Sequence, residues 1–347
     1  MRILHIDSGR EWRGGQRQVY LLARGQRAAG DEPIVIGQPE GPLVRRLRGV
    51  GAAASAVRMR GEWDLAAARR IRAQIRGWRP HIVHAHDARS HALAMAALIG
   101  VRGVPLVVTR RVINAPRGRL KYGSRVARFI AISAAVREAL VTAGVDPRRV
   151  DVVHSGVPAP RVAAARDWRV ELGWPADAVV CGIVGAMTAE KGIGILHDVA
   201  ARLPDDVREH ARLVLLGGHA RGRESIEGLE AFRAGFVDEI HAAMAGLDIL
   251  WHPSSAEGLG TSVIDAMALR VPPVAFAVGG LPELVDNEHS GLLVPAGNVA
   301  AFAAAVARLV RDAPAREQLA AAGPARAAEF SVERMIEGSR AAYARVL

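Results

Sequence analysis

The sequence predicts an α/β protein with two Rossmann-like domains, each built on a parallel sheet, that face each other across a cleft. Three observations support this fold class. The chain has 347 residues, about twice the size of an ordinary domain. Short runs rich in valine and isoleucine alternate with helical patterns, which is typical of a parallel sheet covered on both faces. The alternation stops at residues 157–175, which contain three prolines, and then restarts, so this stretch is expected to be a hinge.

The first half of the chain is expected to begin with a strand at 2–6 and a glycine-containing loop that leads into a helix at 16–29. The other strands expected there are 33–36, 81–86, 105–109, 129–133 and 150–156, and the other helices are 64–76 and 134–143.

The second half repeats the pattern. Its expected strands are 179–185, 211–218, 247–254, 272–277 and 291–295, and its helices start at about 193 and cover 261–269, 298–312 and 331–346. We place the domains at residues 1–160 and 161–330, followed by a C-terminal helix in 331–347.

The composition restricts the class of protein. Half of the residues are hydrophobic and 23% are charged, which excludes wholesale disorder. The sequence contains no uninterrupted run of 18 apolar residues, which argues against a membrane-spanning helix. The start MRILHIDSGREW becomes charged after six residues, unlike a signal peptide. A single cysteine, Cys181, excludes an internal disulfide and a cysteine-based zinc site. We therefore expect an intracellular, cytoplasmic protein.

The positive charge is concentrated in the first half. Residues 1–160 carry 28 basic and 11 acidic side chains, whereas the remainder carries 18 and 24. This asymmetry suggests that the first domain meets an anionic lipid surface or an anionic acceptor, with a merely solvated basic face as the alternative. Nucleic acid is not expected as a partner, because aromatic residues make up only 4% and no nucleic-acid-binding motif is visible.

Ligands of open parallel sheets bind beyond the carboxyl ends of the strands, where helix N-termini offer free amides. Four stretches are expected there. In the first, Gly14 and Gly15 allow a phosphate to approach the backbone, with a plain connecting turn as the alternative. The second carries His84 and His86 on one side of a strand. A metal site would need a third ligand, and none is near in sequence, so we expect His84 to be packed and hydrogen-bonded and His86 to face the cleft.

The third stretch runs from Gly185 to Gly192 and contains Lys191 between a strand and a helix. A lysine there can neutralise a departing phosphate as a point charge. An ordinary helix-start lysine is the alternative. Of the 46 basic residues only Lys121 and Lys191 are lysines, so the use of lysine at this place favours a specific role.

The fourth stretch, residues 254–267, carries the most weight. Its glycine loop opens a helix whose amides suit a pyrophosphate, and two carboxylates flank the loop and can accept hydrogen bonds from sugar hydroxyls. Acidic pairs at this spacing also occur on solvated helices. The candidate binding residues of this stretch are Glu257, Gly258, Leu259, Gly260, Thr261 and Asp265.

These stretches, in this order, resemble the retaining glycosyltransferases of family 4, which have the GT-B fold. The resemblance covers nearly the whole chain, including the VHAH strand, the HSGV segment, the EKG loop and the GFVDEI segment. Its most specific part runs from PSSAEGLGTSVIDAMA through VPPVAFAVGGLPELV to SGLLVPAG. It implies a nucleotide-diphosphate sugar as donor, with a UDP-sugar favoured over a GDP-sugar, no cofactor, no metal, and a C-terminal helix that packs back on the first domain.

The resemblance also implies roles for individual residues. Glu257 would contact the transferred sugar and Asp265 the ribose, as the acids of the family's E-x7-E pair do. Lys191 would bind the donor phosphates, and Gly15 would lie against the diphosphate. His86 would match the histidine near the reacting face of the sugar. The catalytic candidates are His86, Lys191 and Glu257, and the donor-binding candidates outside the fourth stretch are Gly14, Gly15, Gly185 and Lys191.

The sequence departs from the family pattern at three positions. Asp265 is one methylene shorter than the usual glutamate, Ala186 replaces an arginine that shares phosphate binding with the lysine, and Val271 replaces a glycine. The lost arginine removes a charge from stabilisation of the leaving group. Arg110 or Arg111, at a strand end in the basic half, is the candidate replacement.

The resemblance implies transfer with retention at the anomeric carbon. The sequence contains no D-x-D motif, so a metal that bridges the diphosphate is not expected. No residue is a convincing nucleophile, so a front-face reaction in which the leaving phosphate takes the acceptor proton is expected in place of a double displacement. The acceptor is expected in the basic half, where residues 117–129 mix cations with apolar side chains as an interfacial segment would, with a solvated loop as the alternative. This predicts a peripheral enzyme on the inner face of the cytoplasmic membrane that builds a lipid-linked or lipopolysaccharide-type glycan.

Two alternatives come from other classes of protein. The first is a GT-B protein that binds a nucleotide sugar without transferring it, which Ala186 and Asp265 favour. The second is a basic nucleic-acid-binding protein, which the net charge alone favours. Epimerisation of a nucleotide sugar is a related activity, but its enzymes lack the E-x7-E pattern.

Overall fold

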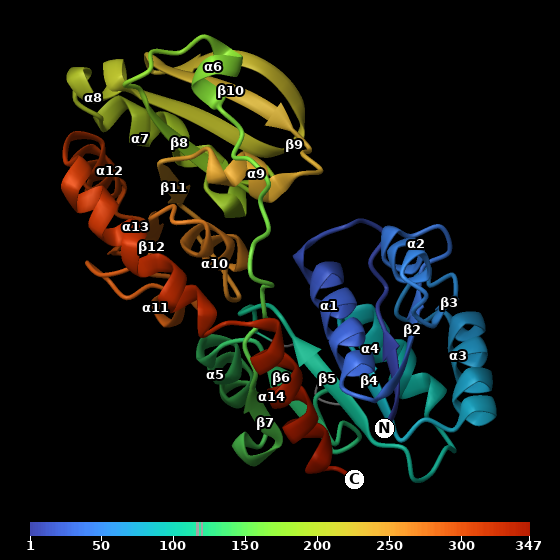
Figure 1. Cartoon of the computed structure of the whole chain (residues 1–347). Helices are drawn as coiled ribbons and strands as arrows, with labels where there is room; N and C mark the ends of the chain where they lie inside the picture. Colours follow the sequence, from blue (N-terminus) through green and yellow to red (C-terminus); the bar gives the residue numbers. More distant parts are fainter. Residues whose placement is uncertain (116–117, 119–120) are drawn as a thin grey trace. The chain divides into compact units, whose positions relative to one another are not determined.

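The computed structural model describes residues 1–115, 118 and 121–347, which form two units. Unit 1 contains Met1–Gly156 and Ser331–Leu347, and unit 2 contains Val157–Phe330 (Figure 1). The chain thus leaves unit 1 after Gly156 and returns to it at Ser331. Among the described residues, no helix has both the length and the apolar character needed to cross a membrane.

Unit 1 is built on a seven-stranded parallel sheet in the order β3-β2-β1-β4-β5-β6-β7. Its strands are β1 (Arg2–Ile6), β2 (Glu32–Gly37), β3 (Ala54–Ala56), β4 (Ile82–Ala85), β5 (Leu106–Arg110), β6 (Arg128–Ala131) and β7 (Val150–Val152). Its helices are α1 (Gly14–Ala28), α2 (Pro42–Gly49), α3 (Leu65–Trp78), α4 (Ala88–Ala97), α5 (Ala134–Thr142) and α14 (Val332–Ala344). The central strands are buried on both faces, which explains their unbroken Val/Ile runs.

Unit 2 has a six-stranded sheet in the order β10-β9-β8-β11-β12-β13, in which only the pairing of β9 with β10 is antiparallel. Its strands are β8 (Val179–Val184), β9 (Ala211–Ile226), β10 (Leu229–Gly235), β11 (Ile249–His252), β12 (Pro273–Phe276) and β13 (Leu292–Val294). Its helices are α6 (Trp168–Leu172), α7 (Leu196–Arg202), α8 (Asp205–His210), α9 (Ile240–Ala245), α10 (Thr261–Ala268), α11 (Leu281–Leu284), α12 (Val299–Arg311) and α13 (Ala313–Ala328).

The β9–β10 hairpin is the main difference from the expected elements, because the strand expected at 211–218 continues to Ile226 and then pairs back. The second half of β9 is mostly exposed and polar, so this part of the strand lacks the apolar run that marks a buried strand. Glu227 and Gly228 both have positive φ, as the central residues of a two-residue hairpin turn do. Other elements were also not expected, since they are short or only weakly amphipathic: the strand β3 and the helices α2, α4, α6, α8, α9, α11 and α13.

The stretch 157–175, expected to be a hinge, is packed into unit 2 from Trp168 onward. The Trp168 side chain is fully buried, and its Nε1 donates a hydrogen bond to the Ala243 carbonyl oxygen at 2.9 Å. The number of prolines, on which the expected hinge was based, does not reveal this packing of Trp168, because its hydrogen-bond partner lies 75 residues away in the sequence.

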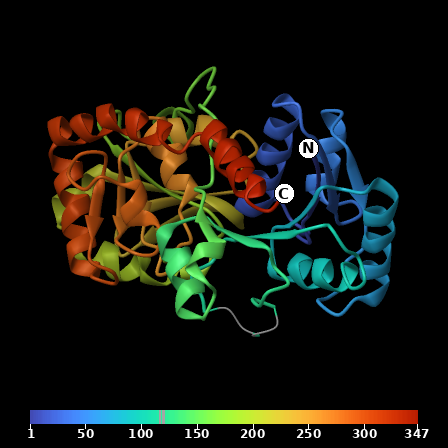
Figure 2. The same ribbon diagram turned by 90° about the horizontal axis from the view of Figure 1, so that it is seen from below.

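The C-terminal helix α14 packs against α1 in unit 1, as Figure 2 shows. Val332, Met335 and Tyr343 join the apolar cluster that contains Ile3 of β1 and Ile82 of β4. The last helix of the chain therefore supports the centre of the first sheet.

Candidate active site

In unit 2, two loops at the carboxyl ends of neighbouring strands bring opposite charges together. The loop after β8 carries Lys191, and the loop after β11 carries Glu257. A hydrogen bond of 2.9 Å from the Ser255 backbone N–H to the Glu190 carbonyl oxygen ties the two loops to each other. As a result the Lys191 ammonium donates a hydrogen bond to Glu257 Oε2, although the two residues are 66 positions apart.

The Glu257 carboxylate is the centre of this charged cluster. Its Oε2 also lies 3.1 Å from His252 Nε2, and Ser254 Oγ lies 3.2 Å from the same nitrogen. Burial acts to raise the pKa of Glu257, but the hydrogen bond from His252 and the charge of Lys191 outweigh it and lower the pKa to about 2. The pKa of His252 is lowered, mainly by burial. Glu257 is therefore an anion that orients Lys191, and His252 is a neutral donor beside it.

The helix α10 begins directly after this cluster and presents its backbone amides there. Its N-cap Gly260 has a φ of +98°, a left-handed conformation that favours glycine, and no side chain in the described part of the chain caps the helix. Gly258 and Thr261 are partly exposed. The Leu259 side chain is buried in the core, so only its backbone is available to a ligand.

Asp265 lies one turn into α10 and is buried. Its Oδ1 lies 3.1 Å from Nε2 of His241, which belongs to α9. A ligand hydroxyl at this carboxylate would share it with His241. His241 could not be found from the sequence, because no spacing rule connects it to Asp265.

Gly185 and Ala186 follow β8 in the same loop as Lys191. A Cβ on Gly185 would lie 3.8 Å from Lys191 Cε, so the lysine side chain runs along this glycine. Ala186 brings no charge to the loop, and Lys191 supplies its positive charge.

In unit 1, Gly14 and Gly15 form the first turn of α1. No side chain among the described residues caps this helix, whose N-cap is Arg13. The Arg111 side chain lies beside the turn, because a Cβ on Gly15 would be 3.7 Å from Arg111 Cδ. An uncapped helix start next to a guanidinium is a suitable site for an anion.

The two arginines after β5 differ in their partners. Arg110 donates hydrogen bonds to Tyr122 Oη at 2.7 Å and to the Asn114 carbonyl oxygen, so its guanidinium is engaged locally. Arg111 Nη2 lies 3.5 Å from His86 Nδ1, and its buried Nε has no hydrogen-bond partner among the described residues. Burial lowers the pKa of Arg111 to about 10 against the opposing effect of Asp7, which leaves it a cation at neutral pH.

Asp7 and Asp87 follow β1 and β4 in the same region. Asp7 Oδ1 accepts hydrogen bonds from the Gly9 N–H at 2.9 Å and from Gln16 Nε2 at 3.0 Å. Burial and the charge of Asp87 raise the pKa of Asp7 to about 6. Asp7 was not among the residues predicted from the sequence, since a lone acid in a loop has no distinguishing pattern.

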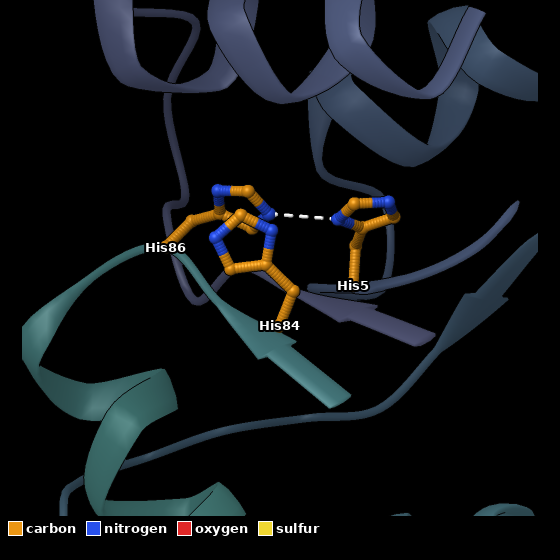
Figure 3. Close-up of side chains that lie close together, drawn as sticks. All are labelled: His5, His84 and His86. Atoms are coloured by element: carbon orange, nitrogen blue, oxygen red, sulfur yellow. Dashed lines mark hydrogen bonds between the residues drawn. The ribbon is translucent and has the colours of Figure 1, made fainter. Parts of the chain in front are cut away.

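His84 and His86 lie next to a third buried histidine, His5 of β1 (Figure 3). His86 Nε2 lies 2.9 Å from His5 Nδ1, and His5 Nε2 lies 2.8 Å from Gln26 Oε1. His5 is a third histidine beside this pair, and it is not near them in sequence. It reaches them because β1 pairs with β4, which places His5 next to His84, 79 positions later in the chain. His84 is packed and hydrogen-bonded as expected.

These three imidazoles are grouped closely enough to be considered as metal ligands. Each of their six ring nitrogens, however, already has a hydrogen-bond partner in the protein. A metal ion would have to replace these bonds, so the arrangement fits a hydrogen-bonded cluster better than a metal site.

The expected interfacial segment 117–129 is only partly described, since Arg117, Arg119 and Leu120 lie outside the described residues. Of its other cations, Lys121 pairs with Glu62 at 3.0 Å, and Arg128 pairs with Asp151. These two cations therefore have acidic partners within the protein.

Comparison with known proteins identifies the class and the family. The family description "Glycosyl transferases group 1" matches residues 178–312, and "Glycosyltransferase Family 4" matches residues 12–161. The chain is 31% identical over 309 residues to the 2-deoxystreptamine N-acetyl-D-glucosaminyltransferase of Streptomyces fradiae, covering 78% of this chain and 73% of that one. It is 33% identical over 233 residues to the D-inositol 3-phosphate glycosyltransferase of Mycobacterium bovis, covering 61% of this chain but only 47% of the relative.

Solved structures show the same fold. HepE of Anabaena in complex with UDP-glucose is 21% identical, with a TM-score of 0.85 over 98% of this chain and 99% of that one. Sucrose-phosphate synthase of Thermosynechococcus elongatus is 20% identical, with a TM-score of 0.76 over 99% and 98% of the two chains. The protein is thus a glycosyltransferase with the GT-B fold, as the sequence resemblance implied. It belongs to the group 1 glycosyltransferases of family 4.

The low pKa of Glu257 predicts how this residue contributes to stability. A carboxylate with a folded-state pKa of about 2, against an ordinary value of 4.5, stabilises the folded protein fully above the ordinary value and progressively less as the pH falls towards 2. We expect the free energy of unfolding lost in Glu257→Gln to be largest above about pH 5 and to shrink on acidification. Urea unfolding at several pH values measures it.

The matched control is Glu317→Gln, because Glu317 is exposed. Its effect on the free energy of unfolding should be small and nearly the same at each pH. A loss in Glu257→Gln that stays constant across the pH series would contradict the ionised cluster.

Proposed function

We propose that this glycosyltransferase is a retaining enzyme that transfers a sugar from a UDP-sugar to a lipid-linked or other anionic glycan of the cell envelope. The observation that carries the donor part is the Lys191–Glu257–His252 cluster at the uncapped start of α10. The observation that carries the acceptor part is the basic character of the first 160 residues.

The cluster in unit 2 suits a nucleotide-diphosphate sugar. The amides at the start of α10 and the Lys191 ammonium would bind the diphosphate oxygens. Glu257, already ionised, would accept hydrogen bonds from hydroxyls of the transferred sugar, and Asp265 would accept one from the ribose. HepE was solved with UDP-glucose, which supports uracil as the donor base.

Arg111 is proposed to replace the positive charge that the family has at the position of Ala186. It lies beside Gly15 at the start of α1, and its Nε is buried without a partner among the described residues. A phosphate oxygen near Gly15 would satisfy this nitrogen and offset the cost of burying it.

The proposed reaction forms one bond and breaks one bond on the same face of the sugar. The acceptor hydroxyl oxygen bonds to the anomeric carbon as the bond from that carbon to the diphosphate oxygen breaks, and the hydroxyl proton passes to the departing phosphate. Lys191 and the amides at the start of α10 stabilise the negative charge that develops on the diphosphate. His86 is proposed to contact the sugar near its reacting face.

A second candidate acceptor is a soluble ring polyol. The two relatives described above are named for 2-deoxystreptamine and D-inositol 3-phosphate, and both names describe six-membered carbocycles. A phosphorylated polyol would also suit the basic first half of the chain.

Ligand-dependent stability tests the donor. With UDP or a UDP-sugar at about 100 times its dissociation constant, we expect about 2.7 kcal/mol of added stability and a rise in Tm of several degrees. GDP should give a smaller shift. Lys191→Ala should lose most of the shift, because the diphosphate loses its nearest cation.

The matched control is Lys121→Ala, which removes the other lysine of the chain. Lys121 pairs with Glu62 in unit 1, and its loss should leave the UDP shift intact. If no nucleotide shifts the Tm of the wild type, the donor proposal is wrong. A UDP shift without product from any acceptor would favour a protein that binds a nucleotide sugar without transferring it.

The role of Arg111 is tested against its neighbour. We expect Arg111→Ala to weaken UDP binding by about tenfold, the scale of one charge-assisted hydrogen bond, as measured by calorimetric titration. Arg110→Ala should change it much less, because Tyr122 and Asn114 already engage that guanidinium. Equal effects of the two substitutions would remove the basis for choosing Arg111.

The acceptor is tested by vesicle binding. We expect the protein to sediment with phosphatidylglycerol vesicles at low salt, less so at high salt, and not with phosphatidylcholine vesicles. The reason is that an arginine-rich surface is attracted electrostatically to anionic lipid, and salt screens this attraction. An absence of binding to anionic vesicles at low salt would contradict the membrane proposal and leave the ring polyol as the acceptor to assay.

A further inference from the structure

A continuous chain of hydrogen bonds runs through the interior of unit 1, from the loop after β5, through α1 and α14, and back to β5. Its side chains are largely buried, and it includes the three histidines of Figure 3. The successive contacts are Arg111 Nη2 to His86 Nδ1 (3.5 Å), His86 Nε2 to His5 Nδ1 (2.9 Å), His5 Nε2 to Gln26 Oε1 (2.8 Å), Gln26 Nε2 to Tyr343 Oη (3.3 Å), Tyr343 Oη to His84 Nδ1 (2.7 Å) and His84 Nε2 to Thr109 Oγ1 (2.7 Å). We call this set the histidine relay.

The three imidazoles of the relay are neutral. Burial lowers the pKa of His5 to about 4, and it lowers the pKa values of His84 and His86 well below their ordinary range. A neutral imidazole has one nitrogen that donates and one that accepts. A histidine of the relay that accepts a hydrogen bond at one ring nitrogen therefore donates one from the other, so each hydrogen bond determines the direction of the next.

Arg111 favours one direction, because a guanidinium has donors and no acceptor, but its 3.5 Å contact with His86 is too weak to hold the tautomer alone. His86 Nδ1 must accept from Arg111, so the proton of His86 is on Nε2 and is donated to His5 Nδ1. The proton of His5 is then on Nε2, where it meets the oxygen of the Gln26 carboxamide. The Gln26 nitrogen donates to the Tyr343 hydroxyl.

The far end of the relay agrees with this direction. The Tyr343 hydroxyl accepts from Gln26 and donates to His84 Nδ1, and His84 Nε2 donates to the Thr109 hydroxyl. All six contacts have one donor and one acceptor when each residue, from Arg111 to Thr109, donates to the one that follows it. The opposite sense would place a proton on His86 Nδ1, facing the donor of Arg111.

We propose that His5, Gln26 and Tyr343 are positioning residues that hold His86 as the Nε2–H tautomer, so that its Nδ1 lone pair is available to a hydroxyl of the transferred sugar. The part concerning the sugar rests on the proposed function, in which His86 contacts the donor. When Arg111 turns to a phosphate, His86 Nδ1 loses a weak 3.5 Å partner and can accept from that hydroxyl instead.

This proposal gives the C-terminal helix a role in the chemistry of a residue more than 250 positions away. Tyr343 contributes its hydroxyl from α14, and Gln26 contributes its carboxamide from α1. Neither residue would contact the substrate under the proposal, because both act through His5.

The experiment compares His5→Phe with His5→Asn in the full chain. Phenylalanine keeps a ring in the buried site but removes the acceptor for His86 Nε2–H. Asparagine returns a carboxamide oxygen near the position of His5 Nδ1. His91→Phe is the matched control, because His91 is a buried histidine of unit 1 outside the relay.

The first readout is nitrogen NMR of the protein labelled with ¹⁵N in its histidines, with the His86 signals assigned by their loss in His86→Gln. Protonated and unprotonated ring nitrogens give distinct signals, so the tautomer is read directly. We expect Nε2–H for His86 in the wild type, in His91→Phe and in His5→Asn. We expect a mixture of tautomers in His5→Phe, because the 3.5 Å contact with Arg111 is too weak to hold the tautomer without His5. Tyr343→Phe should give a smaller shift in the same direction.

Two NMR results would overturn the proposal. One is His86 protonated on Nδ1 in the wild type, and the other is an unchanged tautomer in a folded His5→Phe protein. Addition of Zn²⁺ alone gives a third test, since loss of the His5, His84 and His86 signals on titration would show that these nitrogens bind metal instead of forming the relay.

The second readout is transfer from the UDP-sugar. We expect kcat/KM to fall by about 10- to 100-fold in His5→Phe, the scale associated with removing a group that orients a functional imidazole, and to recover in His5→Asn. A fixed tautomer with unchanged kinetics would overturn the role of His86 toward the sugar. If no donor is turned over by the wild type, the proposed function fails while the NMR result still decides the relay.

Discussion

The chemistry of this protein depends on the direction of its strands. All strands of the unit 1 sheet are parallel, and so are those of unit 2 except β10, so the loops that follow them gather at one edge of each sheet. Two helices, α1 and α10, begin at these edges without a side-chain cap among the described residues. Backbone amides and loop side chains are therefore concentrated where a phosphate can bind, and the rest of the fold serves to hold these edges in place.

Charge neutralisation within unit 2 explains why its polar cluster can be largely buried. An isolated carboxylate at Glu257 would be costly to bury, yet Lys191 and His252 both contact it and favour its ionised form. A diphosphate that drew Lys191 away would leave Glu257 with His252 alone. The sugar hydroxyls that the same donor carries would supply the missing hydrogen bonds, so phosphate and sugar binding are expected to support each other.

The sequence predicted the α/β class and most strands of both sheets, because buried strands leave local patterns. It marked Lys191 and Glu257 as site candidates through their glycine loops, but it did not mark His252, which contacts Glu257 in the unit 2 cluster. It missed the part of β9 beyond residue 218, which is mostly exposed and polar, and it missed β10, which pairs back on β9. It also missed His5, His241 and Tyr343. Each of these residues acquires its meaning from a partner in another element, and Tyr343 lies 317 positions from Gln26. Such pairings depend on the packing of elements, which no local pattern encodes.

The same packing explains why unit 1 needs residues from both ends of the chain. An imidazole that is buried and neutral must find one donor and one acceptor, and His84, in the middle of β4, has Thr109 on one side and the α14 hydroxyl of Tyr343 on the other. Without α14 the Nδ1 atom of His84 and the Nε2 atom of Gln26 would both lose their partner in the interior. The return of the chain to unit 1 after Phe330 is therefore a requirement of its buried polar groups as well as of its apolar core.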